Sequence, residues 1–148
     1  MILKLEHNPS QKDIEVVITY PEKNKTVNRI VTLIKSADMQ ITCYTDDNIA
    51  KLVNASDVYY IESVDKRTFV YCEKENYQVR SPLYRVYEKL ADKGFVQVSK
   101  YCILNINKLD KIKPLFNSRM EAVLSNGISV CVTRKYLEDI KRILQESE

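Results

Sequence analysis

Apolar and polar residues alternate along most of the chain with the period of two that is typical of half-buried β-strands. In the first half, this alternation predicts strands at about 3–5, 14–20, 39–44, 49–53, 58–62, 68–72 and 77–80. In the second half, it predicts two short strands within 95–105 and others at about 110–114, 120–125 and 128–132. A chain with roughly ten short strands belongs to the mainly β (α+β) class.

The period changes to that of an amphipathic helix in three places. The first is about 24–38. The second begins at Ser81-Pro82, where serine can cap the free N–H groups and proline suits the first helical position. It ends before Gly94, which suits the left-handed conformation at a helix end. The third follows Thr133, which is expected to cap it.

A polar stretch at 45–48 divides the chain into two parts. Residues 1–45 follow a β-β-α-β order and form a unit too small to be stable alone. We therefore expect them to be an N-terminal extension that packs on the rest of the chain or on a second copy, and that serves in dimerisation or signal input. Residues 46–148 are expected to form the main domain.

Composition indicates a globular protein with a real core, since 45% of the 148 residues are hydrophobic. No apolar run has the length of a membrane-spanning helix, and the first residues lack the pattern of a signal peptide. We expect a cytoplasmic protein without membrane insertion. The net charge is +3, and residues 94–148 hold 9 basic and 6 acidic residues. Such a local excess suits a polyanionic partner but is also common on ordinary surfaces.

Residues that could support catalysis or hold a metal are scarce. A Ser-His-Asp, Cys-His or histidine–metal site would have to use His7, the only histidine. The two glycines, Gly94 and Gly127, are too far apart for a phosphate-binding loop. The cysteines favour buried thiols, with a zinc site or a disulfide framework as alternatives, and are Cys43, Cys72, Cys102 and Cys131. We expect no enzyme, no cofactor and no metal.

The stretch from Phe95 to Asn105 organises the rest of the chain. Its apolar positions bracket a polar break at Ser99-Lys100, which predicts two short strands joined by an exposed corner. Binding residues are often carried on such loops of a rigid scaffold. Asn105 is expected to be a structural turn residue that holds the corner.

Several stretches of the second part occur together in a characteristic order. They are Asp57–Ser63, Leu83…Leu90…Gly94-Phe95, Val98–Asn105, the hairpin turn at Asn126-Gly127, and Val130–Leu137. In this order, residues from about Asp47 to the end resemble the LytTR DNA-binding domain of bacterial transcription regulators. The first 45 residues resemble the short extension of a stand-alone subgroup without a receiver domain.

The resemblance implies an elongated stack of small antiparallel sheets that binds DNA through loops, which enter successive major grooves and bend the duplex. It places the contacts in three regions: the turn after the strand ending near Glu62, the corner in the central stretch, and the start of the last helix. The corresponding residues here are Lys66, Arg67, Thr68, Ser99, Lys100, Tyr101, Arg134 and Lys135.

The chemistry of these residues suits DNA, because lysine and arginine can donate to guanine edges or hold phosphates. Arg134 is the best candidate for a base contact, since a helix start orients it. Lys66 and Arg67 suit phosphates. Arg134 and Lys135 also oppose the dipole of the last helix, which indicates that an anion binds there.

We therefore expect a sequence-specific transcriptional regulator that binds double-stranded DNA as a homodimer. A signalling or membrane-protein partner is left open. The alternative is a protein-interaction module of the same fold, for which the ten tyrosines could supply contact area.

Overall fold

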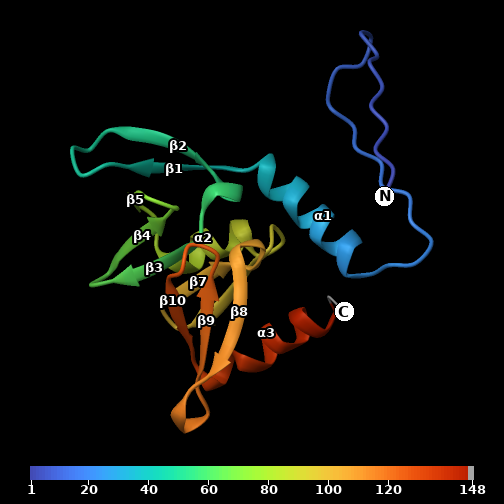
Figure 1. Ribbon diagram of the computed structural model, residues 1–148. Coiled ribbons are helices and arrows are strands. Elements are labelled where there is room, and N and C mark those ends of the chain that lie inside the picture. Colours follow the sequence, from blue (N-terminus) through green and yellow to red (C-terminus); the bar gives the residue numbers. More distant parts are fainter. Residues whose placement is uncertain (147–148) are drawn as a thin grey trace.

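The computed structural model describes residues 1–146, which form ten strands and three helices (Figure 1). The strands belong to a seven-stranded sheet in the order β2-β1-β5-β4-β3-β7-β6 and a three-stranded sheet in the order β10-β9-β8. Every strand pair is antiparallel. The expected mainly β class with small antiparallel sheets is confirmed.

The larger sheet consists of β1 (Gln40–Tyr44), β2 (Ala50–Asn54), β3 (Tyr60–Val64), β4 (Arg67–Tyr71), β5 (Asn76–Val79), β6 (Phe95–Ser99) and β7 (Cys102–Asn105). The smaller sheet consists of β8 (Leu109–Pro114), β9 (Met120–Leu124) and β10 (Ser129–Val132). The helices are α1 (Lys25–Ala37), α2 (Leu83–Leu90) and α3 (Arg134–Glu146). Short 3₁₀ turns lie at Ala55–Asp57, Ile106–Lys108 and Phe116–Ser118. No helix within residues 1–146 has both the length and the apolar character needed to span a bilayer.

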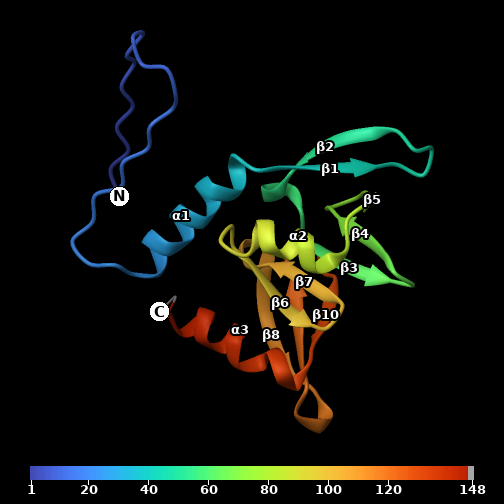
Figure 2. The ribbon, with the colours of Figure 1, turned by 180° about the vertical axis from the view of Figure 1, so that it is seen from behind.

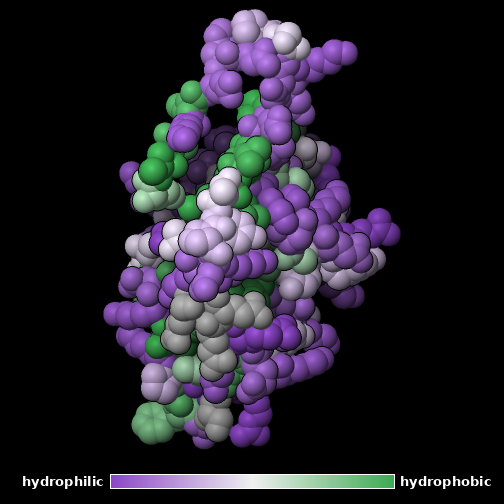
Figure 3. Space-filling model, turned by 90° about the vertical axis from the view of Figure 1, so that its right-hand side faces the viewer, coloured by the Kyte–Doolittle hydropathy of each residue, from purple (hydrophilic) through white to green (hydrophobic). Residues whose placement is uncertain are grey.

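The two strands predicted at 3–5 and 14–20 are wrong. Residues 1–24 contain no strand and extend from the body as an arm, which we call the N-terminal arm (Figures 1 and 2). Hydrophobic side chains lie exposed along it (Figure 3), and Leu3, Leu5 and Ile14 are each more than 80% exposed. Alternation of apolar and polar residues indicates a segment that can join a sheet. A strand also needs a hydrogen-bonding neighbour, which the described chain does not provide here.

Helix α1 follows the arm and agrees with the helix expected at 24–38. The side chain of Asn24 accepts a hydrogen bond from the Val27 N–H at 3.0 Å and caps the helix. Val27 and Ser36 are buried, whereas Leu33 and Ile34 remain 40% and 36% exposed. The apolar stripe of this helix is therefore only partly covered by the body.

Helix α2 agrees with the predicted position but not with the predicted cap. Pro82 rather than Ser81 occupies the capping position, and no side chain caps the helix. Gly94 adopts a φ of +88°, as expected for the chain reversal that leads into β6. Its carbonyl accepts a hydrogen bond from the Ile106 N–H at 2.8 Å, which closes the base of the β6–β7 hairpin.

The β6–β7 hairpin lies between two hydrophobic cores. One core lies against α2 and contains Phe95 and Ile103, and the other lies against the three-stranded sheet and α3 and contains Val98 and Leu104. Successive side chains of a strand point to opposite faces, so neighbouring residues enter different cores. This double burial explains why the hairpin is apolar on both faces.

Asn105 has a structural role, as expected, but it lies at the base of the β6–β7 hairpin, where it pairs with Phe95, and not at the Ser99-Lys100 corner. Its side chain is 1% exposed, its Nδ2 donates to the Val58 carbonyl at 2.9 Å, and its Oδ1 accepts from the Asn107 N–H at 3.0 Å. It thereby ties the end of β7 to the segment before β3.

Replacement of Gly94 by alanine is expected to destabilise the protein more than the same change at Gly127. Both glycines have φ near +90°, so both variants carry backbone strain. An added Cβ at Gly94 would also lie 3.1 Å from Asn107 Nδ2 and 3.3 Å from Thr32 Cβ, whereas Gly127 faces open space. Urea unfolding of both variants measures the difference, and equal losses would contradict the close packing of α1 on this turn.

Asn105→Ala is expected to reduce the free energy of unfolding by about 1–3 kcal/mol, because the buried Val58 carbonyl loses its partner. Asn107→Ala is a matched control at a less buried position of the same turn. Chemical unfolding measures both losses. An Asn105→Ala variant as stable as the unchanged protein would show that this side chain does not hold the hairpin.

Candidate nucleic-acid interface

The turn between β3 and β4 carries the first predicted region. Asp65 and Lys66 have φ of 51° and 65°, the left-handed pair that a two-residue hairpin turn requires. Lys66 and Arg67 are exposed. Thr68 is only 3% exposed, so its predicted DNA contact is wrong. It is the second residue of β4, where it pairs with β3 and β5, and its side chain points to the covered face of the sheet.

The turn between β6 and β7 carries the second region. Ser99 pairs with Cys102, which leaves Lys100 and Tyr101 as a two-residue turn. The Ser63 N–H donates to the Tyr101 carbonyl at 2.8 Å and so links this turn to the end of β3. Lys100 is exposed, Tyr101 is 55% exposed and Ser99 is half-buried. The Lys100 Nζ lies 5.3 Å from the centre of the Tyr101 ring.

The start of α3 carries the third region and is joined to the end of β6. The Thr133 N–H and hydroxyl both donate to the Val98 carbonyl, at 2.9 and 3.5 Å. The Thr133 hydroxyl therefore anchors the helix start to the sheet. Among the described residues, it accepts no hydrogen bond from an N–H group of the helix, in contrast to the predicted cap. Arg134 and Lys135 follow and are exposed.

These backbone contacts bring the three regions together at one end of the seven-stranded sheet. The end of β3 is bonded to the β6–β7 turn, and the end of β6 is bonded to the residue before α3. In both ribbon views, this end lies on the opposite side of the molecule from the N-terminal arm (Figures 1 and 2). Lys66, Lys100 and Arg134 are thus neither scattered nor buried.

The cations at this end lack acidic partners. Ion pairs in the described part of the chain join Lys51 to Glu75, Lys93 to Asp92 and Arg142 to Asp139. They do not include Lys66, Arg67, Lys100, Arg134 or Lys135. A cluster of exposed cations without carboxylate partners produces a positive potential that favours a polyanion.

Sequence reasoning did not include the loop between β8 and β9. Phe116 is 93% exposed and Arg119 is exposed. Met120, the first residue of β9, pairs with Val132, so this loop lies beside the start of α3. The sequence predicted the strands on either side of this loop, at 110–114 and 120–125, but only the register of the smaller sheet shows that the loop belongs to the same end of the molecule.

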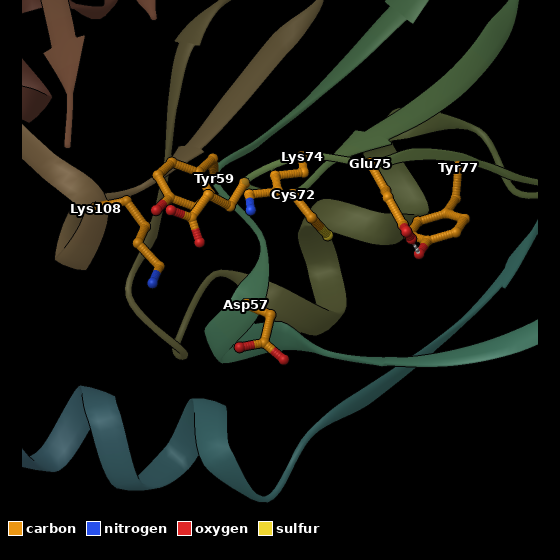
Figure 4. Close-up of a pocket in the computed structure, with 8 residues that line it drawn as sticks. Asp57, Tyr59, Cys72, Lys74, Glu75, Tyr77 and Lys108 are labelled. Carbon is orange, nitrogen blue, oxygen red and sulfur yellow. Dashed lines mark hydrogen bonds between the residues drawn. The ribbon is translucent and has the colours of Figure 1, made fainter. Parts of the chain in front are cut away.

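A shallow cavity of about 270 Å³ lies on another part of the surface (Figure 4). The residues around it include Asp57, Cys72, Glu75 and Lys108. Burial raises the pKa of the Cys72 thiol, and His7, which is exposed on the N-terminal arm, is not among the residues around the cavity. The Lys108 ammonium lies over a tyrosine ring at 4.9 Å. The raised pKa disfavours the Cys72 thiolate, which is the nucleophilic form of this side chain.

The cysteines agree only in part with the expectation of buried thiols. All four are free; Cys43 and Cys102 are buried, Cys72 is half-buried and Cys131 is exposed. Cys131 lies on the outer face of β10, because alternation places its neighbours Val130 and Val132 in the core. Desolvation by burial raises the pKa of Cys43 to about 11 and that of Cys102 to about 12.

Comparison with known proteins relates this chain to a family of DNA-binding domains. A family model described as the LytTr DNA-binding domain matches residues 47–145. A solved LytTr DNA-binding domain from Bacillus cereus superposes with a TM-score of 0.66 at 27% identity and covers 71% of this chain and 95% of that one.

The similar proteins include some that are much longer than this chain and one that is matched over nearly its whole length. The sensory transduction protein LytT of Bacillus anthracis is 26% identical over 140 residues, and the match covers 91% of this chain but 56% of that protein. In LytT of Bacillus cereus, the match is 33% identical but covers 38% of the protein. The chain thus spans about half the length of these relatives, or less. A Staphylococcus aureus protein described as an uncharacterized HTH-type transcriptional regulator is 25% identical, with 97% of this chain and 98% of that protein covered.

Alkylation of the folded protein is expected to modify Cys131 first and Cys43 and Cys102 last. The thiolate is the reactive form, and burial both shields the two inner thiols and keeps them protonated. Iodoacetamide labelling at pH 8, read site by site by mass spectrometry, measures the order, with the urea-unfolded protein as the control. Rapid labelling of Cys102 in the folded state would contradict the two-sided burial of β7.

Proposed function

Because the chain belongs to the LytTR DNA-binding domain family, we propose that it is a sequence-specific transcriptional regulator that binds double-stranded DNA through the turns at one end of its seven-stranded sheet. The observation that supports this function best is the convergence of the three basic regions. Five exposed lysines and arginines without carboxylate partners are held there by backbone hydrogen bonds between the elements that carry them.

The proposed binding mode uses loops. The three helices of the described chain are separated by strands, so no two of them form a helix-turn-helix unit. The β3–β4 and β6–β7 turns are narrow projections that can enter a major groove, which is wide enough for a two-stranded ribbon. Contacts in successive grooves on one side of the duplex would draw the DNA toward the protein and bend it.

Each side chain has a role that follows from its position. Arg134 is held at the first turn of α3 and can donate two hydrogen bonds to a guanine edge. Lys66 and Arg67, at the tip of a turn, contact phosphates, and Lys100 does so from the neighbouring turn. Lys135 adds a phosphate contact, while Ser99 and Tyr101 shape the corner and contact the backbone of the duplex.

The proposal includes a homodimer that binds two half-sites, a cytoplasmic location and no enzymatic activity. Two copies on one duplex double the set of contacts and so raise affinity without any new residue. Residues 1–45 provide the pairing of subunits or the response to a signal in this scheme, and residues 46–148 contact DNA.

Arg134→Ala is expected to weaken binding by about 1–3 kcal/mol and to relax specificity at one base pair of the site. The duplex for the measurement is first selected from a random library with the unchanged protein. Fluorescence anisotropy against this duplex and its single-base variants then measures affinity and specificity. A variant that binds all of these duplexes as the unchanged protein does would remove Arg134 from the interface.

Lys66→Ala and Lys100→Ala are expected to weaken binding to all sequences alike. Removal of one lysine–phosphate ion pair reduces the slope of log K against log salt concentration by about 1, because one fewer counterion is released. Lys35→Ala is the matched control, since this lysine is exposed in the last turn of α1, outside the interface. If none of the interface variants, alone or combined, alters binding while the protein stays folded, the assigned contact residues are wrong. DNA binding by the unchanged protein that is absent or insensitive to salt would indicate a protein-interaction module instead.

A further inference from the structure

The N-terminal arm contains a segment that has the composition of a strand but lacks a partner. Residues Ile14–Tyr20 read Ile-Glu-Val-Val-Ile-Thr-Tyr, and most of these residues are β-branched. Val16 and Val17 are 54% and 75% exposed. Among the described residues, the one backbone-to-backbone hydrogen bond between two residues of the arm joins the Gln11 N–H to the Asn8 carbonyl. Such a segment tends to aggregate unless another strand pairs with it.

The larger sheet has one free edge that suits this segment. Strand β2 is the outermost strand and pairs only with β1, and its Leu52 is 63% exposed. Its one lysine, Lys51, is engaged with Glu75 and the Tyr77 hydroxyl. The opposite edge, β6, is bonded to Thr133. Strand β8, one edge of the smaller sheet, contains Lys111, Lys113 and Pro114, which are residues that oppose strand addition. Strand β10, the other edge of this sheet, contacts β6.

The position of α1 separates the arm from the β2 edge of its own chain. The helix has 13 residues, which corresponds to a length of about 20 Å. The arm joins the first turn of α1, and β1 follows its last turn, so the arm and the β1–β2 hairpin start from opposite ends of the helix (Figures 1 and 2). A second copy can present its β2 edge to the arm without this constraint.

We propose that residues Ile14–Tyr20 of each copy pair as an added strand with the β2 edge of a second copy. This inference rests on the proposed homodimer and specifies its contact. Unpaired backbone groups of the arm and of β2 then satisfy one another, as in other cases of strand addition. The two contacts are equivalent under a two-fold axis, so the interface is closed and self-complementary.

The arm supplies an apolar surface for such a dimer. Each arm exposes a set of large apolar side chains, which are Ile2, Leu3, Leu5, Ile14, Val16, Val17 and Tyr20. A standard stable interface removes roughly 1,600 Å² from water, and the two symmetric contacts reach such a size by burying these side chains against Leu52 and its neighbours on both copies.

Two variants test the two sides of this contact separately. Val16→Pro with Val17→Pro removes two neighbouring N–H groups, one of which must face the partner strand, since successive N–H groups point to opposite edges. Leu52→Lys places a charge on the receiving edge. Lys12→Pro, at the tip of the arm and outside the proposed strand, is the matched control.

Sedimentation without DNA is expected to show a dimer for the unchanged protein and for Lys12→Pro, and a monomer for each of the two test variants. An equimolar mixture of the two variants is expected to recover a heterodimer, because one intact arm can still pair with one intact edge. Native mass spectrometry distinguishes the heterodimer by its mass.

Several results would overturn the proposal: a monomeric unchanged protein, a dimer that survives Leu52→Lys, or a dimer that survives the double proline change. A monomeric unchanged protein includes the case in which the arm folds onto its own chain. A dimer of the Leu52→Lys variant indicates pairing between two arms. A dimer of the double proline variant indicates pairing between two β2 edges. The interface cations are intact in all of these variants, so binding of a single half-site tests the proposed DNA contact independently.

Discussion

The two-sided burial of the β6–β7 hairpin is the constraint on which the structure depends. Ile103 and Leu104 are adjacent in sequence, fully buried, and placed in different cores. Burial of such side chains contributes about 1.5–3 kcal/mol each. Because the hairpin is shared by both cores, the two sheets cannot move independently, and the turn at its tip has a fixed position relative to all the other elements.

The proposed interface depends on this rigidity through a few backbone hydrogen bonds. The Tyr101 carbonyl holds the end of β3, and the Val98 carbonyl holds the residue before α3. Both acceptors belong to the same hairpin. Turns attached in this way lose little conformational entropy on binding, which favours affinity and a defined register on a duplex.

The positive charges at the start of α3, in the proposed interface, slightly lower the stability of the folded protein. Arg134 and Lys135 lie in the first turn of α3, where the helix dipole is unfavourable for cations by about 0.3–1 kcal/mol each. A neighbouring carboxylate could relieve this cost, but none is paired with these residues in the described chain. An anionic ligand that binds beside these cations offsets their unfavourable interaction with the helix dipole, and this gain adds to the affinity for the ligand.

The sequence by itself determined the strands from 39 onward, the three helices, the role of Asn105 and the set of exposed cations, because local periodicity, turn chemistry and capping preferences act over a few residues. The tertiary structure decided what depends on distant neighbours. It buried Thr68 between β3 and β5, turned the Thr133 hydroxyl toward Val98, brought the Phe116 loop to the proposed interface, and left 14–20 without a hydrogen-bonded neighbour in the described part of the chain. For the first three, the deciding contact joins different elements of the fold. For residues 14–20, the deciding fact is that no neighbouring strand pairs with them in the described chain. Neither kind of information leaves a local pattern in the sequence.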